Sequence, residues 1–296
     1  MVSWPDTWAD HGHSTAQETA EAPCQVWGVL NVTPDSFSDG GKHLDHDVAV
    51  ARGHQMVAEG ADVVDIGGES TRPGARRTTL EVEIARVMPV VHRLVADGVV
   101  VSVDTMRAHV AAAAIDAGAR FVNDVSGGAA DPAMLPLLAA TGQHCVLMHW
   151  RGHSEGMSTK AHYRDVLAEV TLELERCVDR AVAAGIATER IIVDPGLGFA
   201  KDSRHNWEVL GGLHRLRTSL GLPVLVGASR KRFLTEMVGG ADASLQDRDT
   251  ATASVSALVA AAGCWGVRVH DVRASSIAVH VGRRMSSSTG GLATVP

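Results

Sequence analysis

The chain has 296 residues, enough for one large α/β domain with a substantial core. Hydrophobic residues make up 45% and charged residues 21%, which is ordinary for a globular protein, and the formal net charge is -7. Because the charge is negative and no basic stripe is visible, no nucleic-acid partner is expected. No apolar run reaches the ~18 residues needed to span a bilayer, so no membrane partner is expected either.

The two ends of the chain differ from the middle in composition. Residues 1–23 are polar and aperiodic, with neither a basic start nor an apolar core, which predicts a flexible extension and not a secretory signal. Residues 286–296 predict a disordered tail, which leaves 24–285 for the folded domain. The four cysteines form no CxxC pair, which favours reduced thiols in a cytoplasmic protein: Cys24, Cys145, Cys177 and Cys264.

Eight short apolar runs alternate with amphipathic segments. The runs are QVWGVL, DVVDIG, VVVSVD, RFVND, HCVLMH, RIIVDP, PVLVGAS and GVRVH. Each is apolar on both faces, as expected for strands of a parallel sheet that helices cover. Eight βα units in about 260 residues predict an α/β fold, a single-domain (β/α)8 barrel. The rival, a doubly wound open sheet, predicts a GxGxxG turn after the first strand, and the sequence has none there.

Two loops near the N-terminus are rich in polar groups. The first run stops at Asn31 and opens into a loop with two carboxylates and Phe37, and buried strands rarely end this way unless the loop binds something. The second run leads into GGESTRPGA, whose glycines let backbone N–H groups approach an anion while Arg72 can fork onto phosphate. This is not a P-loop, because the spacing differs, and taken alone it fits a structural turn equally well.

Polar residues end nearly every apolar run. Since a barrel brings the carboxyl ends of its strands to one face, these residues predict a shared pocket there. A single such residue would more often cap the next helix. The set comprises Asn31, Asp65, Asp104, Asn123 with Asp124, His149, Asp194, Ser229 with Lys231, and Arg268 with His270.

The last two runs supply cations. Lys231 follows the seventh run in GASRKRF and is interpreted as a cation aimed at the barrel mouth. Ser229 has no Asp/His pair to activate it, so covalent acyl chemistry is not expected. Arg268 and His270 alternate in the eighth run and therefore share one face, which suits a pyrophosphate. A salt bridge to a neighbouring helix is the alternative for this pair.

The motifs NVTPDSFSDGG, GGESTRPGA, SVDT, NDVSGG, LMHWRG, DPGLGFAK, GASRKRF and RVHDV follow one another between about residues 24 and 284. In content and order they resemble the dihydropteroate synthase family. The resemblance implies a (β/α)8 barrel, a cytoplasmic homodimer and a transferase of folate biosynthesis. The implied reaction joins (7,8-dihydropterin-6-yl)methyl diphosphate to p-aminobenzoate and releases pyrophosphate, with sulfonamides as competitors of p-aminobenzoate.

The resemblance also implies residue roles. The pterin would be held by Asp104, Asn123, Asp194 and Lys231, with Met148 and Gly227 as further substrate-binding residues. The diphosphate would bind Arg72, Arg268 and His270, and Mg2+ would bind Asn31. The p-aminobenzoate pocket would be lined by Phe37, Thr71, Pro73 and Phe199. The expected catalytic residues are Asp35, which stabilises the developing cation, Lys231 and Arg72.

Two other functions fit parts of the sequence. A pterin-binding methyltransferase barrel shares the Asp/Asn/Asp set but needs a corrinoid-binding or second substrate domain, for which no residues remain. A non-catalytic paralogue should have lost Asn31, Asp35 or Arg72, and all three are present. Both alternatives are therefore less well supported than the synthase.

Overall fold

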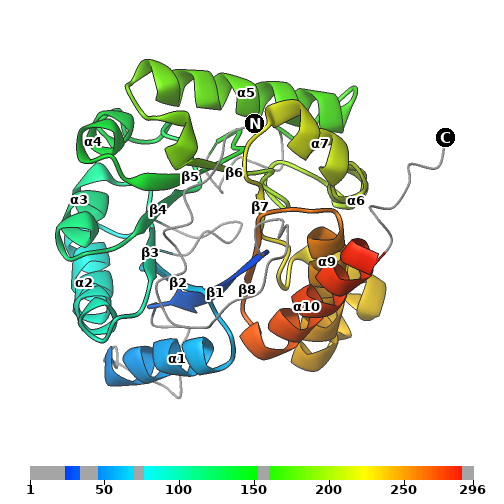
Figure 1. Cartoon of the computed structure of the whole chain (residues 1–296), viewed down its shortest axis with the longest axis horizontal. Coiled ribbons are helices and arrows are strands. Elements are labelled where there is room, and N and C mark those ends of the chain that lie inside the picture. Colours follow the sequence, from blue (N-terminus) through cyan, green and yellow to red (C-terminus); the bar gives the residue numbers. More distant parts are fainter. Residues whose placement is uncertain (1–23, 34–45, 70–76, 153–159, 289–296) are drawn as a thin grey trace.

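The structure is a computed structural model that describes residues 24–33, 46–69, 77–152 and 160–288. Figure 1 shows a ring of strands surrounded by helices. The strands are β1 (Gln25–Asn31), β2 (Val63–Gly67), β3 (Val101–Asp104), β4 (Phe121–Asp124), β5 (His144–Met148), β6 (Ile191–Asp194), β7 (Leu225–Val226) and β8 (Gly266–Val269). All eight expected strands are therefore present.

The eight strands form one parallel sheet in the order β6-β5-β4-β3-β2-β1-β8-β7. The ring closes between β6 and β7 through a bridge from Val193 to Val224 and a 2.9 Å hydrogen bond from Val193 N to Pro223 O. The predicted (β/α)8 barrel is confirmed. β7 is shorter than its apolar run, which starts at a proline that cannot donate to the ladder.

Helices follow the strands and cover the outside of the barrel (Figure 1). They are α1 (His46–Ala58), α2 (Leu80–Ala96), α3 (Ala108–Asp116), α4 (Met134–Thr141), α5 (Val166–Ala183), α6 (Ser203–Gly211), α7 (Leu213–Leu220), α8 (Arg232–Thr235), α9 (Leu245–Ala261) and α10 (Val272–Ser288). Residues 1–23 and 289–296 lie outside the described part, and α10 continues three residues past the expected boundary at 285. No helix among the described residues is long and apolar enough to cross a membrane.

The period-two alternation of the strands separates two apolar clusters. One set of side chains faces the helices, and the other points into the barrel. The inner set forms a plug at one end, in which the ring centroids of Trp27 and Phe121 lie 4.9 Å apart: Trp27, Val63, Phe121, Val146, Ile192 and Leu225. Two positions further along these strands, the inner face carries Asp65, Asn123, Met148, Asp194 and Gly227. The plug therefore closes the barrel beneath a layer of polar side chains.

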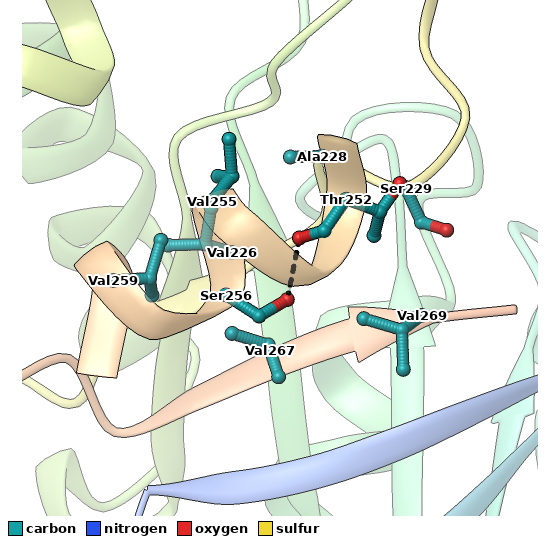
Figure 2. A pocket seen from close by; sticks show the side chains of 9 residues that line it. All are labelled: Val226, Ala228, Ser229, Thr252, Val255, Ser256, Val259, Val267 and Val269. Atoms are coloured by element: carbon teal, nitrogen blue, oxygen red, sulfur yellow. Dashed lines mark hydrogen bonds between the residues drawn. The ribbon is translucent and has the colours of Figure 1, made fainter. Parts of the chain in front are cut away.

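A seam between α9 and strands β7 and β8 is filled by apolar side chains. Figure 2 shows Val255 and Val259 of α9 together with Val226 and Val267 of the barrel wall. Ser256 satisfies its hydroxyl by donating to the Thr252 carbonyl at 2.9 Å. The seam leaves no room for a water molecule, so it is packing between helix and barrel and not a ligand site.

Candidate active site

A buried ion-pair cluster fills the centre of the polar layer. The Arg268 guanidinium lies 3.1 Å from Asp194 Oδ2 and 3.7 Å from Asp65 Oδ2. Arg268 Nη1 also donates to Asn123 Oδ1 at 3.4 Å, and Asn123 Nδ2 donates to Asp65 Oδ2 at 2.8 Å. Asp65, Asn123 and Asp194 are almost completely buried. Three strands that are distant in sequence thus meet at one guanidinium on β8.

Asp104 and Asn31 stand at the rim of this layer. Strand register places Asn31 beside Gly67, Gly67 beside Asp104, and Asp104 beside Asn123. A Cβ at Gly67 would lie 3.6 Å from Asp104 Oδ2 and 3.8 Å from Asn31 Oδ1, so both side chains border the same small space. We call Asp65, Asp104, Asn123, Asp194 and Arg268 the polar floor.

The polar floor holds more carboxyl groups than cations. Asp65, Asp104 and Asp194 face a single guanidinium, Arg268. Burial raises the pKa of Asp104 well above its usual range, and the charge of Asp65 raises it further. Burial also raises the pKa of Asp65, although Arg268 opposes this shift. A ligand that presents several N–H donors would compensate this excess of acceptors.

Gly227 gives the guanidinium its space. A Cβ at this position would lie 2.9 Å from Arg268 Nη2 and 3.5 Å from Asp194 Oδ2. The first distance is closer than side-chain atoms tolerate, so any other residue here would displace Arg268. The expectation that Gly227 belongs to the site therefore has a steric explanation. Met148 also borders the floor, because strand register pairs it with Asp194.

The turn after β7 separates three consecutive basic residues. Arg230 adopts a left-handed backbone with φ 58° and forms two hydrogen bonds to Asp249 of α9, at 2.6 and 2.9 Å. The Arg232 side chain is 87% exposed. Lys231 points inward, where its Nζ donates to the Leu197 carbonyl and lies 4.9 Å from the centroid of the Phe199 ring. Lys231 is therefore the member of this trio that reaches the site.

The environment of Lys231 lowers its pKa to about 7. Burial is the main cause; the Asp194 carboxylate opposes it and the Arg268 charge adds to it. Near neutral pH this amine is therefore partly protonated. It can therefore act as a cation whose charge a bound anion would stabilise.

Ser229 fixes the orientation of His270. The Ser229 hydroxyl lies 2.9 Å from His270 Nδ1 and accepts a 3.1 Å hydrogen bond from the His270 backbone N–H. A hydroxyl that accepts from the backbone N–H can also donate to Nδ1, and in that arrangement the ring proton lies on Nε2. His270 can then offer one N–H donor to an anion. The sequence excluded a nucleophilic Ser229 but did not reveal this positioning role.

The two ends of the second loop are held together by charged side chains. Glu69, after β2, accepts hydrogen bonds from Thr78 N at 3.1 Å and from Arg107 Nη1 at 2.9 Å. Arg107 also pairs with Glu83, and Glu83 accepts a 2.6 Å hydrogen bond from Thr105 Oγ1. Residues 69 and 78, on either side of the loop, are therefore joined through one carboxylate.

A second buried network lies behind the floor. His149, at the end of β5, contacts Lys201 Nζ through Nδ1 and Glu173 Oε2 through Nε2, both at 2.9 Å. Glu173 of α5 also pairs with Arg151. Burial, followed by the Lys201 charge, lowers the pKa of His149 to about 4. The imidazole is therefore neutral, accepting from the ammonium and donating to the carboxylate.

This neutral histidine predicts a loss of stability in acid. Above pH 6.5 the imidazole is neutral in the folded and unfolded chains, whereas below it only the unfolded chain takes up the proton. The free energy of unfolding should fall from about pH 6.5 to about pH 4, with about 3 kcal/mol due to His149. His149→Gln keeps one donor and one acceptor but cannot titrate. Urea unfolding at several pH values should show a shallower dependence in this variant, and an identical dependence would contradict the assignment.

The structure assembles much of the expected site. Asp104, Asn123, Asp194 and Arg268 meet in the floor, and Phe199 lies beside Lys231. Arg268 is engaged by carboxylates, so its expected contact with a diphosphate stays a prediction. Asp124 accepts hydrogen bonds from Ser126 and Gly128 and so stabilises a turn. Five expected residues lie outside the described part: Asp35, Phe37, Thr71, Arg72 and Pro73.

Comparison with known proteins gives a consistent result. The family model described as pterin binding enzyme matches residues 27–270. The dihydropteroate synthase of Mycobacterium leprae is 58% identical over 264 residues, which cover 88% of this chain and 93% of that one. A Xanthomonas albilineans dihydropteroate synthase in complex with 7,8-dihydropteroate has a TM-score of 0.80 and 38% identity, covering 94% and 96% of the two chains. A Yersinia pestis dihydropteroate synthase with a sulfonamide drug has a TM-score of 0.83 and 38% identity, covering 90% and 95%.

Fold and polar floor together define a pterin-binding barrel enzyme. The match spans most of the chain and most of each relative. The chain belongs to the dihydropteroate synthase family.

Proposed function

We propose that this protein is a transferase that condenses (7,8-dihydropterin-6-yl)methyl diphosphate with p-aminobenzoate to give 7,8-dihydropteroate and pyrophosphate. The observation that carries the proposal is the polar floor, where three carboxyl groups and one amide face a single guanidinium. The pterin edge offers a ring N–H and an exocyclic amino group as donors, together with a carbonyl acceptor. Those donors supply what the floor lacks, and Asn123 or a protonated Asp104 can serve the carbonyl.

The groups around the floor suit loss of a diphosphate. Lys231 and His270 can place a cation and an N–H donor against it, which stabilises the departing charge. The dihydropterin ring delocalises the developing methylene cation. The aniline nitrogen is already nucleophilic and needs positioning more than a strong base. Because the amine is the nucleophile, the reaction needs no nucleophilic serine, and Ser229 instead orients His270.

Mg2+ is proposed as the cofactor, with Asn31 as its protein ligand. The Asn31 Oδ1 atom borders the space beside Asp104, at the carboxyl end of β1. Among residues 24–33, 46–69, 77–152 and 160–288, no cluster of His, Cys, Asp and Glu could hold a metal ion. One amide oxygen fits the way Mg2+ binds in phosphate sites, where substrate oxygens and waters fill most positions. When bound, the ion would neutralise charge on the diphosphate.

p-Aminobenzoate is proposed to bind at the barrel mouth beside Phe199. Phe199 packs against Lys231, while the other proposed pocket residues, Phe37, Thr71 and Pro73, belong to loops 32–43 and 68–78. Glycines in those loops predict that the pocket forms only after the pterin diphosphate and Mg2+ bind. Sulfonamides would compete for the same place, as the drug-bound Yersinia pestis relative suggests.

This order predicts how sulfonamide affinity should respond to the other ligands. Calorimetric titration of a sulfonamide should give strong binding with pyrophosphate, Mg2+ and a pterin present. In the bare enzyme the affinity should be at least about tenfold lower, because the pocket residues are not yet in place. Equal affinity in both conditions would indicate a preformed pocket. That result would rule out the ordered scheme while leaving the reaction assignment intact.

The reaction itself is tested by a coupled assay for pyrophosphate. Pyrophosphate should appear only when both substrates are present, together with 7,8-dihydropteroate in equal amount. A pterin-binding barrel without synthase activity would bind the pterin but release no pyrophosphate. Release that does not depend on p-aminobenzoate would indicate simple hydrolysis and would overturn the proposal.

A homodimer is proposed through α9 and α10. These helices lie side by side (Figure 1), and a Cβ at Gly282 would lie 2.1 Å from the Ala257 carbonyl oxygen, so they pack closely. Ile277 and Val281 are spaced four residues apart on α10 and more than half exposed, and Leu258 beside Ala257 is 68% exposed. This apolar surface supports association with a second copy.

A cytoplasmic location is proposed as well. Four free thiols, all buried, support it.

A further inference from the structure

The chain between β6 and α6 has an unusual backbone. In this β6–α6 link, residues 195–200, Gly196 and Gly198 have φ of 66° and 76°, and Ala200 has φ of 48°. An alanine in the left-handed region costs free energy, because its Cβ approaches the neighbouring carbonyl. Contacts from outside must therefore hold the link in this shape.

Lys201, the next residue of the chain, supplies such contacts. Its Nζ donates to the carbonyl oxygens of Gly196 at 3.0 Å and Phe199 at 3.2 Å, and it contacts His149 Nδ1 at 2.9 Å. Three acceptors match the three hydrogens of an ammonium group, and Lys201 is 8% exposed. The strained Ala200 is held separately, because the Tyr163 hydroxyl donates to its carbonyl at 3.0 Å.

Burial lowers the pKa of Lys201 well below its usual range, and the charge of Lys231 lowers it further, while the Asp194 and Glu173 carboxylates oppose the shift. His149 joins the ammonium to Glu173, whose carboxylate also pairs with Arg151. Arg151 stacks on the Tyr163 ring, with its guanidinium carbon 3.9 Å from the ring centroid. Both side chains that hold the link thus belong to one connected cluster between β5 and α5.

The link also contacts Lys231. The Leu197 carbonyl accepts a hydrogen bond from Lys231 Nζ, and the Phe199 ring lies against the same ammonium. A Cβ at Gly198 would lie 2.9 Å from Lys231 Cδ, so the absent side chain makes room for the lysine. Three consecutive residues of the link therefore form the wall along which Lys231 lies.

We propose that Lys201 is a positioning residue that acts through Lys231. By fixing the β6–α6 link, it holds the Lys231 ammonium in place against Leu197 and Phe199. It would not touch the substrate itself, since its hydrogens are used by the link and by His149. This inference rests on one part of the proposed function, namely that Lys231 contacts the pterin.

A double-mutant cycle tests this role, with pterin affinity measured by calorimetry. Lys201→Met removes the ammonium but keeps most of the volume, and it should weaken pterin binding about tenfold. In a Lys231→Ala background the same change should have an effect of less than about twofold, because the group it positions is gone. Lys160→Met, at an exposed lysine, is the matched control and should bind as the wild type does.

The cycle distinguishes positioning from general stabilisation. The proposal would be overturned if the fold-losses of pterin affinity in Lys201→Met and Lys231→Ala simply multiply in the double variant. It would also be overturned if Lys201→Met binds the pterin as tightly as the wild type. If Lys201→Met does not fold, Tyr163→Phe takes its place, because it removes only the bond to Ala200; its loss of about threefold should likewise vanish without Lys231. Failure of the wild type to release pyrophosphate would contradict the reaction and still leave the binding cycle readable.

Discussion

Replacing Asp194 by asparagine should weaken pterin binding by about 2–3 kcal/mol, a loss of roughly 30- to 150-fold. The substitution keeps the volume but turns Oδ2, which lies 3.1 Å from Arg268 Nη2, into a donor that faces the guanidinium and the N–H groups of the pterin. Asp194 is completely buried and water cannot compensate the lost pairing. Its other oxygen accepts a 2.7 Å hydrogen bond from Gly196 N, which an asparagine oxygen can retain.

Calorimetry with a pterin ligand measures this effect, and thermal unfolding shows whether the variant stays folded. Asp202→Asn is the matched control, because Asp202 caps α6 on the same stretch of chain and lies outside the polar floor. Asparagine caps helices about as well as aspartate. Unchanged pterin affinity in Asp194→Asn would contradict the floor as the pterin site.

Lys231→Ala should reduce turnover at least tenfold, equivalent to about 1.4 kcal/mol of transition-state stabilisation. The variant loses the inward-pointing cation of the β7–α8 turn. Arg232→Ala is the control, since that neighbouring side chain is 87% exposed and pairs with Glu236 at 3.3 Å. Near-normal turnover in Lys231→Ala would remove Lys231 from the catalytic residues.

The pH dependence of binding provides a second test of Lys231. Burial lowers the pKa of its amine to about 7, so the amine loses its proton as the pH rises through that value. Pyrophosphate affinity of the wild type should therefore decrease above about pH 7. The decrease should be smaller in Lys231→Ala, which has no amine to titrate.

The barrel could be predicted from sequence because its strands obey a simple pattern. Runs such as RIIVDP and GVRVH are apolar on both faces, and their ends carry the polar residues that converge. Once Trp27 and Phe121 are placed inside the barrel, the period of two puts Asn123 above them on the same face. Asp104, Asn123 and Asp194 could therefore be grouped without coordinates.

Side-chain pairing could not be predicted in the same way. Asp65 interrupts an apolar strand, which signals an inner polar position, but its partner Arg268 lies 203 residues later in the chain. Lys201 is the last residue of the DPGLGFAK motif, and the sequence gave no sign that its side chain folds back to Gly196 and Phe199. Such contacts depend on three-dimensional loop geometry, which local spacing does not encode.

Some expected roles depend on parts of the chain outside the described residues. Asp35, Phe37 and Arg72 belong to the first two loops, and their roles stay predictions from the family resemblance. The two ends of the second loop, Glu69 and Thr78, are joined by a hydrogen bond, which fixes where this loop begins and ends. The ordered sulfonamide binding predicted above tests these loops together.

The central claim is that the pterin lies in the polar floor, and a crystal structure of the complex with a pterin tests it most directly. The account predicts that the aminopyrimidinone edge of the ligand lies within hydrogen-bond distance of Asp104, Asn123 and Asp194, with the Lys231 ammonium beside the ring. A pterin bound elsewhere, with the contacts of Arg268 to Asp194 and Asn123 undisturbed, would contradict it.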